Sequence, residues 1–201
     1  MQFFFNHVRM RLLASLLVFG LCACSPQRVQ FQSIDVTGAD YAKEFTLTDH
    51  NGQSRSLSDF KGKVVVLFFG YTQCPDVCPT TMVELAEVKR LLGADASKLQ
   101  VVFVTVDPAR DTTELLKAYM TNFDPTFVAF VPTADELTDV AKRFKIYYKK
   151  QEGKTPTSYT MDHSAGSYVY DTQGNVRLYS RYGSGAKVLA QDIQTLLRTT
   201  P

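Results

Sequence analysis

The stretch KVVVLFFGY, residues 63–71, is a continuous apolar run rich in branched and aromatic residues. Such a run is typical of a central strand buried on both faces, because a strand with one solvent face alternates apolar and polar residues. Two more runs of this kind follow, at 99–106 and 127–131. Apolar residues at helical spacing follow each run, over residues 80–92, 111–122 and 134–144. Strands that alternate with helices predict β-α-β units and a mostly parallel sheet.

Two predicted hairpins flank this alternating part. In residues 45–60, two short alternating stretches surround Asn51-Gly52, a dipeptide favoured in tight hairpin turns. Near the other end, GSYVYD and VRLYSRYG surround the turn at 172–175, and a final helix is expected at 186–198. The predicted fold class is therefore α/β, with a mixed central sheet, helices on both faces and an N-terminal hairpin extension.

The first 23 residues have the features of a secretory signal. Residues 1–11 contain two arginines and no acid, and residues 12–21 are almost wholly apolar but too short for a confident membrane span. The sequence Leu21-Cys22-Ala23-Cys24 is similar to a bacterial lipobox, in which the last cysteine becomes the lipid-modified N-terminus. An ordinary cleaved signal, or an uncleaved helix with incidental cysteines, is the alternative.

This interpretation predicts the domain organisation and the location. Residues 1–23 form a lipoprotein signal peptide, residues 24–42 form a tether and residues 43–201 form one domain. Lipid on Cys24 would hold the protein at a membrane of the bacterial cell envelope, facing the periplasm. Whether that is the inner or the outer membrane stays open.

Charge excludes a nucleic-acid partner. The whole chain has a formal net charge of +2, and Arg9 and Arg11 lie in the predicted signal, so the remainder is close to neutral. Lysines and arginines do not cluster with aromatic residues, and attraction to phosphate backbones depends on such a basic surface. No feature predicts an obligate oligomer, and we expect a monomer.

Cys74 and Cys78 lie at the point where the first apolar run gives way to a predicted helix. A spacing of four residues is about one helical turn, so both sulfurs can lie over one helix end, where the helix dipole favours the thiolate. A disulfide staple would close a very short loop and remove little entropy from the unfolded chain. Structural zinc takes four nitrogen or sulfur ligands and common iron–sulfur clusters take four thiolates, whereas the predicted mature domain keeps only two free thiols, Cys74 and Cys78.

Copper binding and electron exchange therefore remain. Two thiolates with one imidazole suit copper. His50 lies in a predicted turn and is expected to be solvated, whereas a mobile loop containing EGKTPTS could carry His163 to the cysteines. Position alone leaves the role of His163 open. Met82 and Met161 lie near these residues in the sequence, and we expect both to be packing residues.

Three signatures occur in order along the chain: a strand–GYTQCPDVCP–helix segment, DPARDT at 107–112, and DHS at 162–164 followed by a Tyr-Val-Tyr-Asp strand. Together they resemble the Sco/SenC family, thioredoxin-like copper proteins that help to assemble the CuA centre of cytochrome c oxidase. The match spans about residues 43–197. This resemblance implies a thioredoxin-like fold, with Cys74, Cys78 and His163 as the ligands of Cu(I) or Cu(II).

The resemblance also extends to neighbouring acidic and basic residues. Asp76, between the cysteines, matches a family position that tunes or orients the site, and a solvated turn carboxylate is the alternative. Asp107, Arg110 and Asp111 match the DPxRDT segment. For these three we expect strand termination, an internal ion pair and helix capping, and not direct contact with copper; either Asp111 or Thr112 can cap the helix that follows.

Two functions follow from this interpretation, and whether the protein is an enzyme stays open. The first is a copper-binding assembly factor whose partner is an apo-oxidase subunit carrying the CuA site, or another copper carrier. The second is a thiol–disulfide oxidoreductase that reduces the cysteines of a partner; exchange needs two thiols, whereas copper needs His163 as well. A peroxidase of the peroxiredoxin kind is disfavoured, because Tyr71 and Leu67 replace the threonine and proline typical of that family.

Overall fold

The computed structural model describes residues 29–155 and 158–200. The chain divides into two compact units, Met1–Gln30 and Phe31–Pro201, and the second contains every element discussed below. The predicted signal peptide at 1–23 and the predicted lipidation site, Cys24, lie outside the described residues. Within those residues, none of the helices is both long enough and apolar enough to span a membrane.

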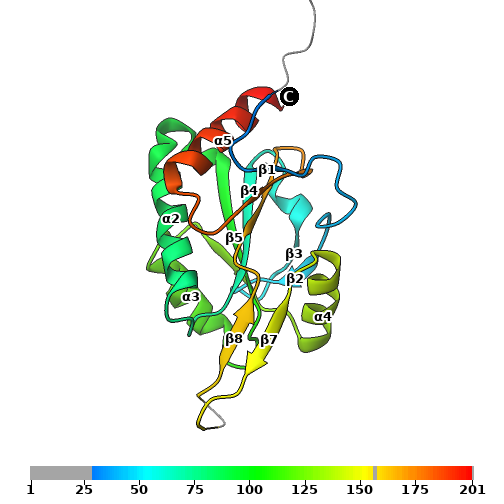
Figure 1. Ribbon diagram of the computed structural model, residues 1–201, viewed down its shortest axis with the longest axis vertical. Coiled ribbons are helices and arrows are strands. Elements are labelled where there is room, and N and C mark those ends of the chain that lie inside the picture. Colours follow the sequence, from blue (N-terminus) through cyan, green and yellow to red (C-terminus); the bar gives the residue numbers. More distant parts are fainter. Residues whose placement is uncertain (1–28, 156–157, 201) are drawn as a thin grey trace, which may run out of the picture. The chain divides into compact units, whose positions relative to one another are not determined.

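A six-stranded mixed sheet forms the centre of the domain, in the order β1-β10-β9-β4-β5-β6 (Figure 1). Its strands are β1 (Ile34–Asp35), β4 (Val64–Gly70), β5 (Leu99–Thr105), β6 (Val128–Phe130), β9 (Ser167–Tyr170) and β10 (Val176–Ser180). The three strands predicted from apolar runs, β4, β5 and β6, pair in parallel, and β9, β10 and β1 add antiparallel pairs. Every residue of β4 and β5 is buried, as continuous apolar runs predict.

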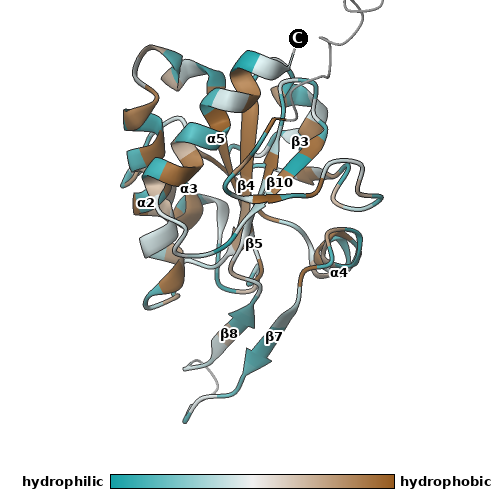
Figure 2. Ribbon diagram, turned by 45° about the horizontal axis from the view of Figure 1, so that its top comes forward, coloured by the Kyte–Doolittle hydropathy of each residue, from teal (hydrophilic) through white to brown (hydrophobic). Residues whose placement is uncertain are grey.

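Four described α-helices cover the two faces of the sheet. They are α2 (Val77–Leu91), α3 (Thr113–Thr121), α4 (Ala134–Arg143) and α5 (Ala186–Thr199), and short 3-10 helices span Leu57–Phe60 and Gly93–Lys98. In both views α2, α3 and α5 lie on one side of the sheet and α4 lies on the other (Figures 1 and 2). The predicted mixed sheet with helices on both faces is confirmed.

The predicted N-terminal hairpin is present as a separate two-stranded sheet, β2 (Thr46–Thr48) and β3 (Ser54–Ser56). A bridge between Asp49 and Phe130 joins it to the edge of the main sheet. Next to this bridge, His50 exchanges two hydrogen bonds with Ala129: its backbone N–H donates to the Ala129 carbonyl, and its Nδ1 accepts from the Ala129 N–H at 2.9 Å. The expectation that His50 is a solvated turn residue was therefore wrong, because its ring fastens the hairpin to β6.

Part of the predicted tether is joined to the domain. Strand β1 pairs with β10, and just before it the backbone N–H groups of Gln32 and Ser33 donate to the carboxylate of Asp192 on α5, at 2.9 and 2.8 Å. The sequence did not predict this strand, because two residues carry no periodic signal.

A second small hairpin projects from one end of the main sheet (Figures 1 and 2). It consists of β7 (Tyr148–Gln151) and β8 (Thr160–His163), which pair with each other and with no strand of the six-stranded sheet. All eight residues are half-buried or exposed. The sequence predicts a mobile loop here, whereas the structure places His163 at the end of a strand.

Candidate metal centre

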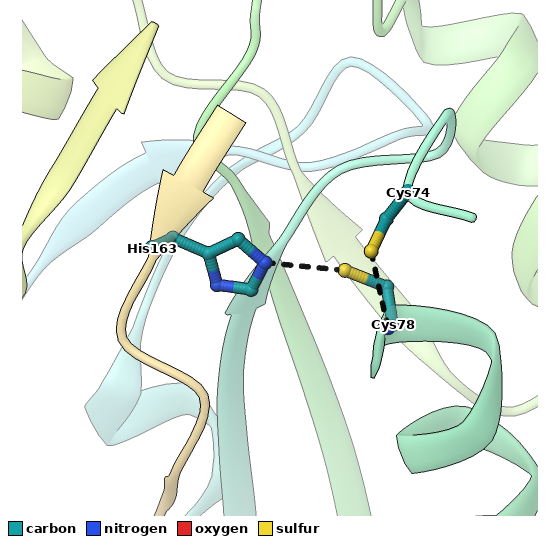
Figure 3. Close-up of side chains that lie close together, drawn as sticks. All are labelled: Cys74, Cys78 and His163. Atoms are coloured by element: carbon teal, nitrogen blue, oxygen red, sulfur yellow. Dashed lines mark hydrogen bonds between the residues drawn. The ribbon is translucent and has the colours of Figure 1, made fainter. Parts of the chain in front are cut away.

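The two cysteines lie at the N-terminus of α2. This helix begins at Val77, three residues earlier than predicted, so Cys78 lies in its first turn, and Cys74 lies in the loop that follows β4. The backbone N–H of Cys78 donates to the Cys74 sulfur at 3.4 Å (Figure 3). Cys78 is fully buried and Cys74 is half-buried. Both sulfurs therefore gather at one helix end, with only Cys74 open to solvent.

Their surroundings give the two thiols very different acidities. The pKa of Cys74 is lowered to about 5, chiefly because the Cys78 thiol donates to its sulfur, helped by the N–H groups of Asp76 and Cys78, against the effect of burial. The pKa of Cys78 is raised, because its proton is held by Cys74 and because it is buried. The pair thus presents one thiolate and one thiol at neutral pH, and the thiolate is the form that binds metals.

His163 approaches from β8 with its ring orientation fixed. Its Nδ1 lies 3.0 Å from the Ser164 carbonyl, which can only accept, so Nδ1 carries the proton. Its Nε2 lies 3.4 Å from the Cys78 sulfur (Figure 3). Phe68 and Tyr71 pack against the ring in edge-to-face geometry, each with its centroid 5.9 Å away. This tautomer leaves the Nε2 lone pair free, as metal coordination requires.

The ligand atoms of Cys74, Cys78 and His163 all lie within 4.8 Å of one another. Among the described residues, no other group of three or more His, Cys, Asp or Glu side chains is placed in this way. Two soft sulfurs with one imidazole fit Cu(I), and nitrogen with thiolate can also hold Cu(II), whereas structural zinc would need a fourth ligand. The donor set therefore fits copper.

Gly70, the last residue of β4, was not anticipated as part of the site. A Cβ atom there would lie 2.9 Å from the Cys78 sulfur, 2.8 Å from the Phe68 ring and 2.9 Å from the Phe103 ring. The strand can pass this close to Cys78 only because the residue has no side chain. An isolated glycine within a strand pattern is the sequence signal for such a close approach.

Asp111 fastens the cysteine loop to the sheet. Its carboxylate is fully buried and accepts from the Thr72 N–H at 3.1 Å, the Thr72 hydroxyl at 2.6 Å and the Thr105 hydroxyl at 2.5 Å. Burial raises the pKa of Asp111, while these hydrogen bonds oppose the shift. Of the two expected caps of α3, Asp111 and Thr112, the structure has Thr112, whose hydroxyl accepts from the Leu115 N–H. Asp111 therefore supports the loop two residues before Cys74.

The other expected neighbours are arranged as follows. Asp107 follows the end of β5, is buried and forms an ion pair with Arg110, as predicted. Asp76 is exposed at the N-cap position of α2, so the structure leaves its tuning role a prediction. Met82 is fully buried and Met161 packs against the core, which agrees with their expected packing roles.

Comparisons with known proteins agree with these observations. The family model described as SCO1/SenC matches residues 35–198. The mitochondrial SCO2 homolog of Bos taurus is 33% identical over 157 residues, which cover 77% of this chain and 58% of that protein. An SCO2-like protein of Rickettsia conorii is 34% identical over 132 residues, covering 65% of this chain and 64% of that protein. The chain thus spans less than two thirds of the length of these two curated relatives.

Solved structures show the same fold. Copper-bound ScoI of Bradyrhizobium japonicum is 38% identical with a TM-score of 0.69, covering 75% of this chain and 96% of that one. Copper-bound yeast Sco1 is 28% identical with a TM-score of 0.72, covering 79% and 88%. Apo Sco1 of Thermus thermophilus is 29% identical with a TM-score of 0.73, covering 86% and 99%. The predicted thioredoxin-like fold class is confirmed.

Proposed function

Because the chain belongs to the SCO1/SenC family, we propose that it binds copper through Cys74, Cys78 and His163 and assists the assembly of the CuA centre of cytochrome c oxidase. The observation that carries this proposal is the convergence of two sulfurs and one free imidazole nitrogen within 4.8 Å. Copper is the cargo in this function. The partner is an apo-oxidase subunit carrying the CuA site, or another copper carrier.

The site suits a cargo that must enter and leave. The lowered pKa of Cys74 supplies a thiolate at neutral pH, and the hydrogen bond from His163 to Ser164 keeps Nε2 available as a ligand. Cys78 and the core close the site from behind, so exchange with a partner would proceed at the half-buried Cys74. Both Cu(I) and Cu(II) are compatible with these donors.

A copper titration of the reduced protein tests this function. We expect one tightly bound copper per chain, lost in Cys74→Ser and Cys78→Ser and weakened by at least about 100-fold in His163→Ala. His50→Ala is the matched control, because His50 fastens the β2–β3 hairpin and should leave copper affinity unchanged. Charge-transfer absorption between thiolate and Cu(II) gives a second readout. Copper binding that does not depend on His163, or does not depend on the cysteines, would contradict the proposal.

The different exposure of the two cysteines favours one alternative, thiol–disulfide exchange. The Cys74 thiolate would attack a partner disulfide, forming a mixed disulfide and releasing one partner thiolate. Cys78 would then lose its proton and attack the Cys74 sulfur, releasing the second partner thiolate and leaving a Cys74–Cys78 disulfide. The partner gains the two electrons that the cysteine pair loses. If His163→Ala reduces a disulfide substrate at the wild-type rate while copper binding proves weak, this alternative becomes the working function.

For the N-terminal part we propose a lipoprotein signal peptide at 1–23, lipidation of Cys24 and a tether at 24–42 whose last part packs on the sheet. The domain at 43–201 would then be a monomer held at the bacterial cell envelope and facing the periplasm. Membrane fractionation of Cys24→Ser tests this. The variant should become soluble, and mass spectrometry of the wild type should find lipid on Cys24.

A further inference from the structure

The side chain of Arg110 lies between the two parts of the metal centre. Its Nη1 donates to the side-chain oxygen of Gln73 at 3.1 Å and to the backbone carbonyl of Tyr159 at 2.9 Å. Gln73 directly precedes Cys74, and Tyr159 directly precedes the strand that ends at His163. One guanidinium nitrogen thus bonds to the cysteine loop and to the β7–β8 hairpin.

Asp107 and Tyr159 make further contacts with this guanidinium. Asp107 Oδ2 accepts from Arg110 Nε, and Asp107 Oδ1 accepts from the Tyr159 hydroxyl at 2.8 Å. The Tyr159 ring lies against the guanidinium, with its centroid 3.5 Å from the Arg110 Cζ. The side chains of Arg110 and Asp107 are only 14% and 4% exposed, so water screens their charges little. We call Asp107, Arg110 and Tyr159 the clasp.

Apart from the clasp, a limited set of side chains holds the β7–β8 hairpin to the domain: Tyr148 and Met161 pack against the core, and Phe68 and Tyr71 pack against the His163 ring. The strands of the hairpin pair only with each other among the described strands, and their residues are half-buried or exposed. A two-stranded hairpin is at best marginally stable by itself in water. At the end of the hairpin nearest the sheet, Tyr147 and Ser164 exchange two hydrogen bonds. The position of His163 therefore depends on side-chain contacts such as those of the clasp.

The cysteine loop is held by a separate set of bonds. Asp111, the neighbour of Arg110, binds Thr72 and Thr105 from within the core, and Cys78 belongs to α2. Loss of the clasp should therefore loosen the hairpin more than it displaces the sulfurs. Arg110 and Asp111 thus both bond to the cysteine loop, but of these two residues only Arg110 also bonds to the hairpin.

We propose that Arg110 is a positioning residue of the metal centre, which acts through His163 by holding the β7–β8 hairpin against the cysteine loop. This inference rests on the proposed copper function for its main readout. When the hairpin is released, His163 supplies the third ligand for only part of the time. Affinity then falls by the fraction of molecules in which His163 is in place.

A double-mutant cycle in the full chain tests this coupling. Copper affinity is measured by competition with a Cu(I) chelator in Arg110→Gln, His163→Ala and the double variant. Arg110→Gln alone should weaken binding by about 10- to 100-fold, the usual effect of losing a group that orients a ligand, and should move the Cu(II)–thiolate absorption towards that of His163→Ala. In the His163→Ala background, the same change should add almost nothing.

Two control variants distinguish a loss of His163 positioning from a general effect on the fold. Arg143→Gln removes an arginine of α4 that bonds to Asp139 and to the Glu44 carbonyl, and it should leave copper affinity unchanged. Arg110→Lys keeps the charge beside Asp107 but lacks the fork of donors, so it should show a smaller loss of the same kind. It also serves as the test variant if thermal unfolding shows that Arg110→Gln does not fold.

The outcomes distinguish this inference from the proposed function. If the losses of copper affinity in Arg110→Gln and His163→Ala add fully in the double variant, Arg110 does not act through His163. That result would overturn the positioning role of Arg110 and leave the proposed copper site unaffected. If wild-type copper binding does not depend on His163, the proposed function fails. Amide hydrogen exchange then tests separately whether Arg110 holds the β7–β8 hairpin in place. Exchange in β8 should be faster in Arg110→Gln than in Arg143→Gln, and equal exchange would reject the clasp.

Discussion

The two parts of the metal centre are built in opposite ways. The cysteines lie between β4, every residue of which is buried, and the first turn of α2, with Asp111 holding the intervening loop from the core. His163 ends a two-stranded hairpin outside the main sheet whose residues are half-buried or exposed. The two sulfurs are thus fixed by the core, whereas the imidazole is held by a small number of side chains, among them Phe68 and Tyr71.

This difference separates two properties that a cargo site needs. A rigid pair of sulfurs keeps its reactivity whether or not the third ligand is in place. A ligand on a weakly attached element can leave at a small cost in free energy, because elements with few buried contacts open locally without global unfolding. In the proposed function, departure of His163 would therefore be the first step of release, before exchange with a partner at Cys74.

The largest expected effect is the difference in reactivity between the two thiols. Alkylation of Cys74 by iodoacetamide should be half-maximal near pH 5, because its pKa is lowered to about 5 by the hydrogen bond from Cys78. At pH 7 Cys78 should react at least about 1,000-fold more slowly, because it is buried and its pKa is raised. Peptide mapping by mass spectrometry measures both rates. Half-maximal reaction of Cys74 near pH 8.5, the value of an ordinary thiol, would show that the core does not set the acidity of the pair.

Hydrogen exchange should distinguish the two parts of the site directly. Amides of β8 should exchange at least about 100-fold faster than those of β4, because the hairpin can open without unfolding the core. Added copper should slow exchange in β8 and leave β4 unchanged, since only the hairpin gains an attachment. Mass spectrometry with peptide resolution measures this. Equal protection of the two strands would contradict the idea of a rigid half and an adjustable half.

The Gly70→Ala variant adds one methyl group and tests how rigidly the core holds the cysteines. Gly70→Ala would place a Cβ atom 2.9 Å from the Cys78 sulfur and 2.8 Å from the Phe68 ring. Overpacking of this kind in a buried core should lower the free energy of unfolding by about 1–3 kcal/mol and weaken copper binding with it. Lys149→Ala, on the exposed face of β7, should change stability by less than about 0.5 kcal/mol. If Gly70→Ala leaves the free energy of unfolding and the copper affinity unchanged, the backbone and side chains around the cysteines can move to accept the added methyl group. Urea unfolding measures both variants.

The sequence predicted the rigid half of the molecule better than the adjustable half, for a physical reason. Strands β4 and β5 are buried on both faces and appear as unbroken apolar runs, and the cysteine spacing matches a helical turn. Strands β7 and β8 are short and polar, so neither periodicity nor composition marks them. The resemblance to a known family identified His163, but local pattern alone could not have placed it beside the cysteines.

Long-range contacts explain the remaining gaps. Asp111 was expected to cap a helix, and it instead binds Thr72, 39 residues away. Arg110 was expected to pair with Asp107, which is three residues away, and its bond to the Tyr159 carbonyl spans 49 residues. Pairs close in sequence can be deduced from spacing, whereas distant partners are set by the packing of the whole domain.

The smallest expected effect is on the pH dependence of stability, and it follows from a comparison of the two histidines of the domain, His50 and His163. At His163 the Nδ1 atom donates to a carbonyl and leaves Nε2 free, whereas at His50 the Nδ1 atom accepts from the Ala129 N–H. The neutral His50 ring therefore carries its proton on Nε2, which removes that nitrogen as a metal ligand. A histidine that accepts a backbone hydrogen bond is a structural residue that acid disrupts.

The pKa of His50 is lowered, first by burial and then by Lys117 and Arg55, with Asp49 opposing. Because its folded-state pKa lies below the unfolded value of about 6.5, its contribution to stability is complete above that pH and is lost as the pH falls through the folded value. His50→Gln can still accept from Ala129 but does not titrate. Urea unfolding at pH 8 and pH 5 should therefore show a loss for the wild type that exceeds the loss for His50→Gln by up to about 1 kcal/mol, the worth of one hydrogen bond. Cys74 titrates equally in both proteins, so its contribution cancels from this difference. If both proteins lose the same unfolding free energy between pH 8 and pH 5, His50 does not fasten the β2–β3 hairpin through its neutral ring.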